Sequence, residues 1–207
     1  MRPEAVIFDI GNVLTRWQPE AFYDRVIGAD RRLALFNSVD LHRMNALVDD
    51  GALFRETIYD WADRHPDWAP EIRMWYDHWI ELASPRIEGS IALLRALRRK
   101  GVPVFALTNF GSHAYDEARN MLDFLNEFDR EYVSGRLQVS KPDPRIYQAV
   151  EADCGIAPDR LLFADDRAEN VMAAARRGWR THRFESWQGW AERLVAEDLL
   201  TRKEAGL

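Results

Sequence analysis

The stretch VIFDIGNVLTRW, residues 6–17, determines the fold prediction. Its apolar start, residues 6–8, has the continuous hydrophobic character of a strand buried on both faces of a parallel sheet. The aspartate that follows, Asp9, leads into a turn that contains Gly11 and Asn12. Open α/β sheets bind their ligands at the carboxyl ends of the strands. The stretch therefore predicts a buried strand that presents a carboxylate in a binding crevice.

Beyond residue 86, helical and strand patterns alternate along the chain. The expected elements are a helix over 88–100, a strand over 102–110, a helix over 112–125, a strand around 132–134, a helix beginning near 142, a strand over 160–165, a helix that Gly178 stops, a strand over 179–184 and a helix from about 187. Repeated strand–helix units predict an α/β fold. We expect a Rossmann-like, doubly wound parallel sheet with helices on both faces.

Residues 15–85 contain no convincing strand but show the apolar spacing of helices. Inserted directly after the first strand, this segment is expected to form an α-helical cap over the mouth of the sheet. The expected domains are therefore a core formed by 1–14 and 86–207 and a cap formed by 15–85. The cap tryptophans have two interpretations, as the core of a small helical bundle or as the wall of a substrate pocket shared with Trp17 or Asn45. These tryptophans are Trp61, Trp68, Trp75 and Trp79.

Composition limits the partners of the chain. The 28 basic and 34 acidic residues give a net charge of −6, which predicts no basic face for nucleic acid or for an anionic membrane. No apolar run approaches the roughly 18 residues that cross a bilayer. The single cysteine, Cys154, allows no internal disulfide, and because a strand is predicted so early in the sequence we expect no signal peptide. We expect a cytoplasmic protein, as a monomer or a homodimer.

Further polar residues follow the other predicted strands: Thr108 and Asn109, Lys141, and the pair Asp165 and Asp166. Each has an ordinary explanation by itself, as a turn residue, a helix cap or a solvated loop lysine. In a doubly wound sheet, however, all of them converge with Asp9 on one crevice. Clustered carboxylates are unfavourable unless a cation neutralises them, and Mg²⁺ prefers such oxygen ligands. The pattern predicts a Mg²⁺ site beside phosphate-binding groups, with Asp9 as a nucleophile.

Four segments carry a family resemblance, and they run in order from residue 8 to residue 171: FDIGNVL (8–14), LTN (107–109), SKPDPRIY (140–147) and FADDRAENV (163–171). They resemble the four motifs of the haloacid dehalogenase (HAD) superfamily of hydrolases. The segment after the first motif resembles a C1 helical cap. The details of the first and last motifs are similar to those of bacterial sugar-1-phosphate phosphatases and of the N-terminal phosphatase domain of soluble epoxide hydrolase.

The resemblance implies a role for each site residue. Asp9 corresponds to the nucleophile and a Mg²⁺ ligand, and Lys141 to the lysine that stabilises charge on the nucleophile and the phosphoryl group. Thr108, with Asn109 beside it, corresponds to the phosphate-binding position. Asp166 aligns with the principal metal ligand of the last motif, and Asp165 and Asn170 align with supporting positions. If the alignment of this motif were shifted by one residue, Asp165 would take the place of Asp166 as the principal ligand. The carbonyl of Gly11 is the remaining expected ligand.

The implied activity is Mg²⁺-dependent hydrolysis of a small phosphorylated metabolite, such as a sugar phosphate, through an aspartyl-phosphate intermediate. The alternatives are a 2-haloacid dehalogenase-type hydrolase and a non-catalytic HAD-fold protein that binds a ligand. The acidic pair favours the metal-dependent phosphatase over the dehalogenase, because true 2-haloacid dehalogenases work without a metal.

Gly11 departs from the family pattern. Most phosphatases of the superfamily have an aspartate at this position, which protonates the leaving oxygen and later activates water. Such acid–base catalysis is typically worth about 10²–10⁴-fold in rate. Its absence disfavours a phosphomutase. We expect the substrate, an ordered water or a cap residue to replace the acid. His42, His113 and Glu117 are the candidates, although both histidines also suit ordinary surface positions.

Overall fold

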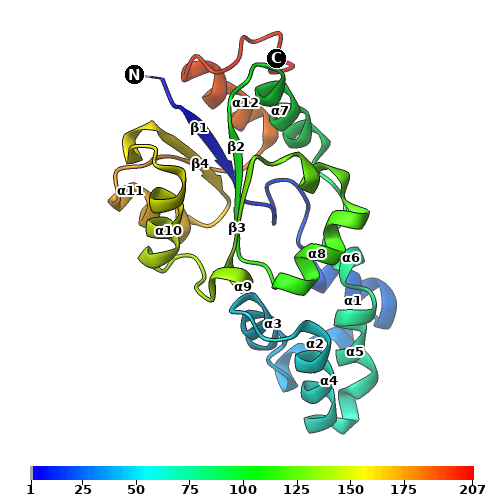
Figure 1. The fold of residues 1–207 in the computed structure, drawn as a ribbon. Helices are drawn as coiled ribbons and strands as arrows, with labels where there is room; N and C mark the ends of the chain where they lie inside the picture. The colour runs from blue at the N-terminus through cyan, green and yellow to red at the C-terminus, as the bar shows by residue number, and fades with distance from the viewer. Residues whose placement is uncertain (1) are drawn as a thin grey trace.

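The computed structural model describes residues 2–207 and contains the expected parallel sheet. Its strands are β1 (Ala5–Phe8), β2 (Val104–Thr108), β3 (Arg130–Val133), β4 (Leu161–Asp165) and β5 (Arg180–Arg183). They run in the order β3-β2-β1-β4-β5, and every neighbouring pair is parallel. The predicted doubly wound α/β fold is confirmed, and β1 lies at its centre (Figure 1).

Helices cover both faces of the sheet. The core helices are α7 (Glu88–Arg99), α8 (Ser112–Met121), α9 (Ser134–Leu137), α10 (Pro144–Cys154), α11 (Ala168–Arg176) and α12 (Trp187–Ala196), with short 3-10 turns at Asp123–Glu127 and Pro158–Arg160. In Figure 1, α10 and α11 lie on one face, and α7 and α12 lie on the other. Strand β1 explains this arrangement, because its alternate side chains point to opposite faces. Ile7 packs with the α10 side of the core and Phe8 with the α12 side.

The secondary-structure elements described between β1 and α7 are all helices. This insert consists of α1 (Pro19–Ile27), α2 (Ala29–Ser38), α3 (Leu41–Asp49), α4 (Phe54–Arg64), the 3-10 turn Pro66–Trp68, α5 (Ala69–Asp77) and α6 (Trp79–Leu82). These helices lie beyond the end of the sheet to which the strands point (Figure 1). All of them fall within 15–85, although the domain boundaries themselves stay a prediction. No helix in residues 2–207 is long and apolar enough to cross a bilayer.

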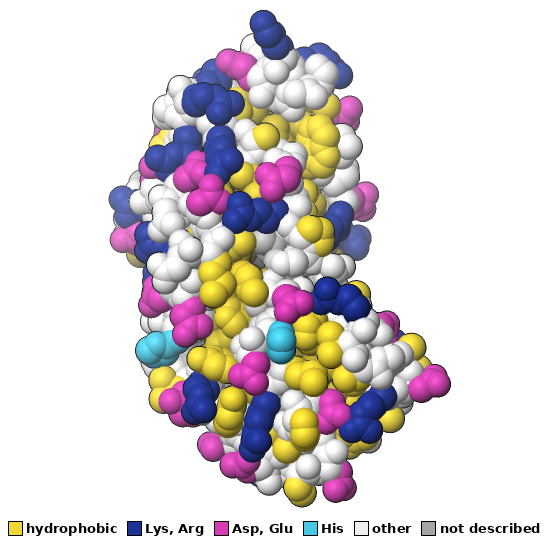
Figure 2. Space-filling model, turned by 90° about the vertical axis from the view of Figure 1, so that its right-hand side faces the viewer, with side chains coloured by type: hydrophobic (Ala, Val, Ile, Leu, Met, Phe, Trp, Pro, Cys, Tyr) yellow, Lys and Arg dark blue, Asp and Glu magenta, His cyan; other side chains and the backbone are white. Residues whose placement is uncertain are grey.

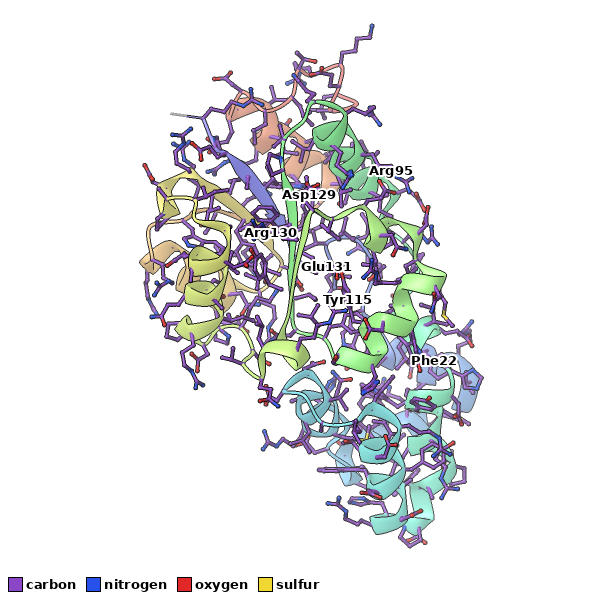
Figure 3. All side chains as sticks on the ribbon, in the orientation of Figure 1. Phe22, Arg95, Tyr115, Asp129, Arg130 and Glu131 are labelled. Atoms are coloured by element: carbon purple, nitrogen blue, oxygen red, sulfur yellow. The ribbon has the colours of Figure 1, made fainter. Side chains whose placement is uncertain are left out.

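Side-chain packing joins the insert to the core. One continuous hydrophobic cluster contains residues of β1, α7, α12 and most of the insert. In Figure 2 the molecule has two lobes, and hydrophobic side chains form a band across the junction between them. Tyr115 of α8 lies buried between its helix and the sheet, whereas Phe22 lies in the insert (Figure 3). The insert is therefore held against the mouth of the sheet by buried apolar surface.

Several element boundaries differ from the expected ones by one or two residues, as at both ends of β2 and at the start of β3, and two differences have a clear tertiary cause. Helix α8 ends at Met121, and the chain then forms a 3-10 turn that buries Phe124 and Leu125. The predicted strand at 132–134 ends at Val133, because Ser134 begins α9. In both places buried tertiary contacts override the local pattern.

Candidate active site

A cavity of about 190 Å³ lies between the carboxyl ends of the strands and the insert. The core contributes residues from three strand ends and the following loops, chiefly Asp9, Gly11, Asn12, Thr108, Asn109, Lys141 and Asp166. The insert and its entry loop contribute Trp17, Asn45, Val48, Asp49, Phe54 and Trp79. Apart from Asp165, every predicted catalytic, substrate-binding or metal-binding residue lines this cavity, and Asp165 is hydrogen-bonded to the lining residue Lys141.

Three carboxylates meet at the core side of the cavity. Asp9, Asp165 and Asp166 each offer an oxygen atom, and these atoms lie within 4.8 Å of one another. Burial raises the pKa of Asp9 to about 7, Lys141 opposes the rise, and Asp165 and Asp166 add to it. Burial raises the pKa of Asp166 as well. Carboxylates this close favour a bound cation, which would stabilise their ionised forms.

Lys141 is the internal counter-charge of this cluster. Its buried Nζ lies 2.9 Å from Asp9 Oδ1, and it donates hydrogen bonds to Asp165 Oδ2 at 2.6 Å and to the Leu107 carbonyl at 2.9 Å. Burial alone would lower the pKa of Lys141, but the two aspartates outweigh burial and raise it. The ammonium group therefore stays charged, and one of its three contacts holds the nucleophile candidate Asp9 while the other two fix the ammonium group itself.

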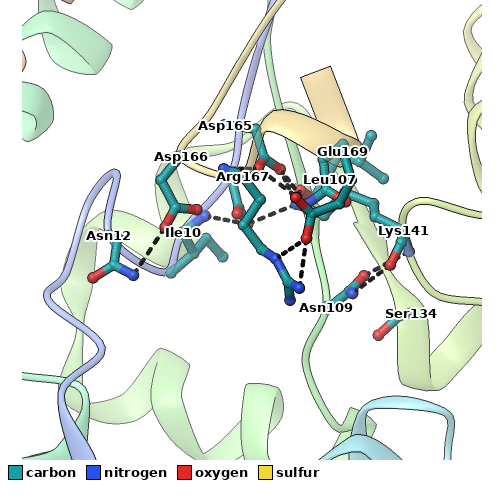
Figure 4. A network of polar contacts seen from close by, with 12 residues as sticks. Ile10, Asn12, Leu107, Asn109, Ser134, Lys141, Asp165, Asp166, Arg167 and Glu169 are labelled. Carbon is teal, nitrogen blue, oxygen red and sulfur yellow. Dashed lines mark hydrogen bonds and ion pairs between the residues drawn. The ribbon is translucent and has the colours of Figure 1, made fainter. Parts of the chain in front are cut away.

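Asn109 holds Lys141 in position. Its Oδ1 accepts a hydrogen bond from the Lys141 backbone N–H at 2.8 Å, and its Nδ2 donates to the Lys141 carbonyl at 2.9 Å (Figure 4). Thr108 is the last residue of β2 and also lines the cavity. Within residues 2–207 its hydroxyl has no hydrogen-bond partner, so it is available to a ligand.

Asp165 and Asp166 differ in their surroundings. Both oxygens of Asp165 are occupied, by Lys141, by the Asn170 amide and by the Arg167 backbone N–H at 2.8 Å. Asp166 is only partly buried and lines the cavity. This difference favours Asp166 as the direct ligand of a cation and Asp165 as the group that orients its neighbours.

Asn12 is a site residue that the sequence analysis missed. It adopts the left-handed conformation with φ of 56°. Its Nδ2 donates to Asp166 Oδ2 at 3.0 Å (Figure 4), and its Oδ1 accepts from the Trp17 backbone N–H at 3.0 Å. Asparagine tolerates this conformation better than most residues, so its position in the turn was the available signal. Asn12 therefore orients Asp166.

An unpartnered oxygen atom at the site is consistent with the binding of a hard cation. Asn170 donates its Nδ2 to Asp165, which leaves its Oδ1 buried and without a hydrogen-bond partner. An orphaned oxygen beside three carboxylates suits a hydrated metal ion, because a bound water would donate to it. The donor set consists of oxygen atoms, as Mg²⁺ prefers.

The three residues suggested as a replacement acid lie elsewhere. His42 is exposed and contacts Glu20 at 3.1 Å, and His113 and Glu117 are exposed on α8. None of the three lines the cavity within the described residues. His42 and His113 have the ordinary surface positions that the sequence also favoured, and His113 and Glu117 belong to the core helix α8 and not to the cap. The insert instead places Asp49 in the cavity wall, a residue that the sequence analysis did not consider.

A family model described as haloacid dehalogenase-like hydrolase matches residues 3–178. The chain belongs to the haloacid dehalogenase-like hydrolase family. The expectation of a hydrolase is thereby confirmed.

Two curated proteins are similar to this HAD hydrolase over most of its length. Hexitol phosphatase B of Escherichia coli (strain K12) is 25% identical over 178 residues, which are 82% of this chain and 78% of the relative. D-ribitol-5-phosphate phosphatase of Bacteroides thetaiotaomicron is 23% identical over 206 residues, which are 92% of this chain and 96% of the relative. The HAD hydrolase is thus related to phosphatases of sugar alcohol phosphates.

A solved structure shares the fold of this HAD hydrolase. A HAD family enzyme from Bacteroides thetaiotaomicron superposes with a TM-score of 0.70 at 22% identity, covering 94% of this chain and 99% of the other. The same enzyme has been solved in complex with magnesium and inorganic phosphate, and that structure superposes with a TM-score of 0.66 at 19% identity, covering 89% and 95% of the two chains.

Proposed function

We propose that this protein is a Mg²⁺-dependent phosphomonoesterase that acts on a small phosphorylated metabolite through a phosphorylated Asp9. The observation that carries the proposal is the cluster of three carboxylates around the buried Lys141, with the unpartnered oxygen of Asn170 beside it. A dehalogenase site has no use for a cation-binding cluster, whereas phosphoryl transfer requires neutralisation of the phosphoryl oxygens.

The cation would be held by Asp9, Asp166 and the Gly11 carbonyl, with Asp165 and Asn170 in support. When bound, it supplies positive charge to the phosphoryl oxygens. Asp9 attacks phosphorus from the core side and displaces the leaving oxygen toward the cap, because attacking and leaving oxygens lie roughly in line.

Other groups position the phosphoryl group and the nucleophile. The Thr108 hydroxyl donates to a phosphoryl oxygen. Lys141 stabilises the charge on Asp9 before the attack and on the phosphoryl group afterwards. Asn109 contributes by holding Lys141, since its side-chain amide is already occupied by the Lys141 backbone.

A sugar phosphate or sugar alcohol phosphate is the proposed substrate class. The related phosphatases named above support this class. The cavity is small, and its cap side combines the polar Asn45 and Asp49 with the aromatic Trp17 and Trp79. Aromatic faces and a few polar groups suit a short polyol chain.

Phosphate release from p-nitrophenyl phosphate and from a panel of sugar and polyol phosphates tests the proposed function. We expect release with Mg²⁺ and none with chelator. Halide release from 2-chloropropionate in chelator, without phosphate release, would assign dehalogenase chemistry instead. Binding of inorganic phosphate and Mg²⁺ without turnover of any substrate would identify a ligand-binding protein.

Trp79 should influence which substrate is preferred. Its indole lines the cavity and packs edge-on against Phe110, with ring centroids 6.0 Å apart. Trp79→Phe is expected to change the ratio of kcat/KM values between two panel substrates by about tenfold, because it reshapes the pocket wall. Trp68→Phe is the matched control, since Trp68 packs against Arg31 away from the cavity. If Trp79→Phe and Trp68→Phe both kept the ratio of kcat/KM values of the unmodified protein, Trp79 would have only a packing role.

A further inference from the structure

The cap side of the cavity contains a carboxyl group that the roles above do not use. Among the described residues that line the cavity, the carboxyl groups are Asp9, Asp166 and Asp49. The first two belong to the core cluster, whereas Asp49 is the last residue of α3 in the insert. It is partly buried and lies on the side toward which an in-line displacement drives the leaving oxygen.

The end of α3 is docked firmly onto the catalytic face of the core. The Asp49 carbonyl accepts a hydrogen bond from Ser134 Oγ at 2.5 Å, and Asp50 Oδ1 accepts one from Ser140 Oγ at 2.6 Å. Val48 packs so closely against Gly111 that a Cβ at Gly111 would lie 2.4 Å from Val48 Cγ1. Since Ser140 precedes Lys141, these contacts set Asp49 beside the phosphoryl-binding groups.

A chain of side chains orients the Asp49 carboxyl group. The indole Nε1 of Trp75 donates to Asn45 Oδ1 at 3.0 Å, and Asn45 Nδ2 donates to Asp49 Oδ2 at 3.0 Å. An indole N–H can only donate, so it fixes which end of the Asn45 amide faces Asp49. Trp75 itself is fully buried and packs edge-on against Trp17, with ring centroids 5.7 Å apart. One oxygen of Asp49 is thereby held, and the other is left for a ligand.

We propose that Asp49, delivered by the cap, is the general acid and base that replaces the side chain missing at Gly11. This inference rests on the proposed phosphatase function. As Asp9 bonds to phosphorus and the bond between phosphorus and the leaving oxygen breaks, the proton of Asp49 passes to that oxygen, which leaves as an alcohol. Water then attacks the phosphorus atom of phosphorylated Asp9, its proton passes to the Asp49 carboxylate, and phosphate and free Asp9 are released.

The charges around Asp49 suit both halves of this cycle. Burial raises the pKa of Asp49 to about 7, Asp50 adds to the rise, and the Asn45 hydrogen bond and Lys141 oppose it. Asp9, Asp166 and Arg167 are the other charged groups around the same cavity. A carboxyl group with this pKa is present in both protonation states near neutral pH, as a proton shuttle requires.

Asp49→Asn tests the proposal with two classes of substrate. On the polyol or sugar phosphate that the unmodified protein hydrolyses fastest, we expect kcat to fall by about 10²-fold or more, because an alkoxide needs a proton to leave. On p-nitrophenyl phosphate, whose leaving group needs no proton, we expect a rapid burst of about one nitrophenol per active site, followed by slow turnover.

The pH profile gives an independent readout. Because Asp49 must be protonated to act as the acid, kcat/KM for the alkyl phosphate should decline above about pH 7, whereas the burst rate with p-nitrophenyl phosphate should not. The decline should be absent in Asp49→Asn. Asp60→Asn is the matched control, since Asp60 is exposed on α4 of the insert and does not line the cavity. It should leave both the alkyl phosphatase rate and its pH profile unchanged.

The outcomes separate the two proposals. Alkyl phosphatase activity of Asp49→Asn within about threefold of the unmodified protein would overturn the role of Asp49. Equal loss of the burst and of alkyl turnover would also overturn it, because a missing acid cannot slow the departure of nitrophenolate. Absence of phosphate release from the unmodified protein with either substrate would overturn the proposed function itself.

Discussion

Asp9→Asn is expected to lower Mg²⁺-dependent phosphate release by at least about 10⁴-fold, since loss of a nucleophile removes the covalent route entirely. The substitution keeps the size of the side chain, and an amide oxygen can still accept from the Ile10 backbone N–H and from Lys141. A neutral amide is, however, a poor nucleophile toward phosphorus. Phosphate release with saturating Mg²⁺ measures the effect on both aryl and alkyl phosphates.

The same variant should be folded and at least as stable as the unmodified protein in chelator at pH 8. The raised pKa of Asp9, about 7, means that folding opposes its ionisation. A carboxyl group whose pKa is raised on folding contributes stability at low pH and loses it as the pH rises through the folded-state value. At pH 8 the native carboxylate is therefore unfavourable, and asparagine avoids this cost.

Asp60→Asn is the matched control for Asp9→Asn, because Asp60 is exposed on α4 and does not line the cavity. It should leave the rate unchanged. Metal-dependent release by Asp9→Asn within about 100-fold of the unmodified protein would contradict the role of Asp9 as nucleophile, whatever its stability.

Lys141→Met should be the most destabilising single change at the site. It removes the donor shared by Asp9, Asp165 and the Leu107 carbonyl, and it leaves these acceptors buried. Removal of one partner of a buried ion pair typically costs about 3–5 kcal/mol, because the opposite charge is left uncompensated. We expect a loss of about that size in the free energy of unfolding, measured by urea denaturation in chelator at pH 8.

Magnesium should restore part of the stability of Lys141→Met, since a cation bound only by the folded state neutralises the same carboxylates and stabilises that state. Lys203→Met is the matched control, because Lys203 is exposed near the C-terminus. A loss below about 1 kcal/mol in Lys141→Met would show that Lys141 is not the main counter-charge. Phosphatase activity of Lys141→Met should fall at the same time by about 10²-fold or more.

Much of the core could be predicted because its signals are local. The apolar run before Asp9 alternates between the two faces of the sheet, and each following strand and helix has its own periodicity and stop signal. Since parallel strands direct their carboxyl ends to one edge, the order of Thr108 and Asp166 along the chain was enough to predict that they meet Asp9. Lys141 follows α9 rather than a strand, and its backbone is held at the site by Asn109.

The choice between Asp165 and Asp166 required the structure. Both follow the same strand, and their spacing alone allows either to face the crevice. Only the hydrogen bonds of Asp165 to Lys141, Asn170 and Arg167 show that its oxygens are occupied. The role of Asn12 depends in the same way on a contact with a residue far along the chain.

The sequence by itself determined the α/β fold, the helical insert and the convergence of the core residues, because strand periodicity and strand direction are properties of short segments. Only the tertiary structure brought Asp49 to the cavity and left His42, His113 and Glu117 outside it. From the sequence alone, an acidic residue at the end of an amphipathic helix is predicted to be exposed to solvent. Its placement here depends on the docking of α3 against Gly111 and Ser134, which is set by packing between distant segments and by no local pattern.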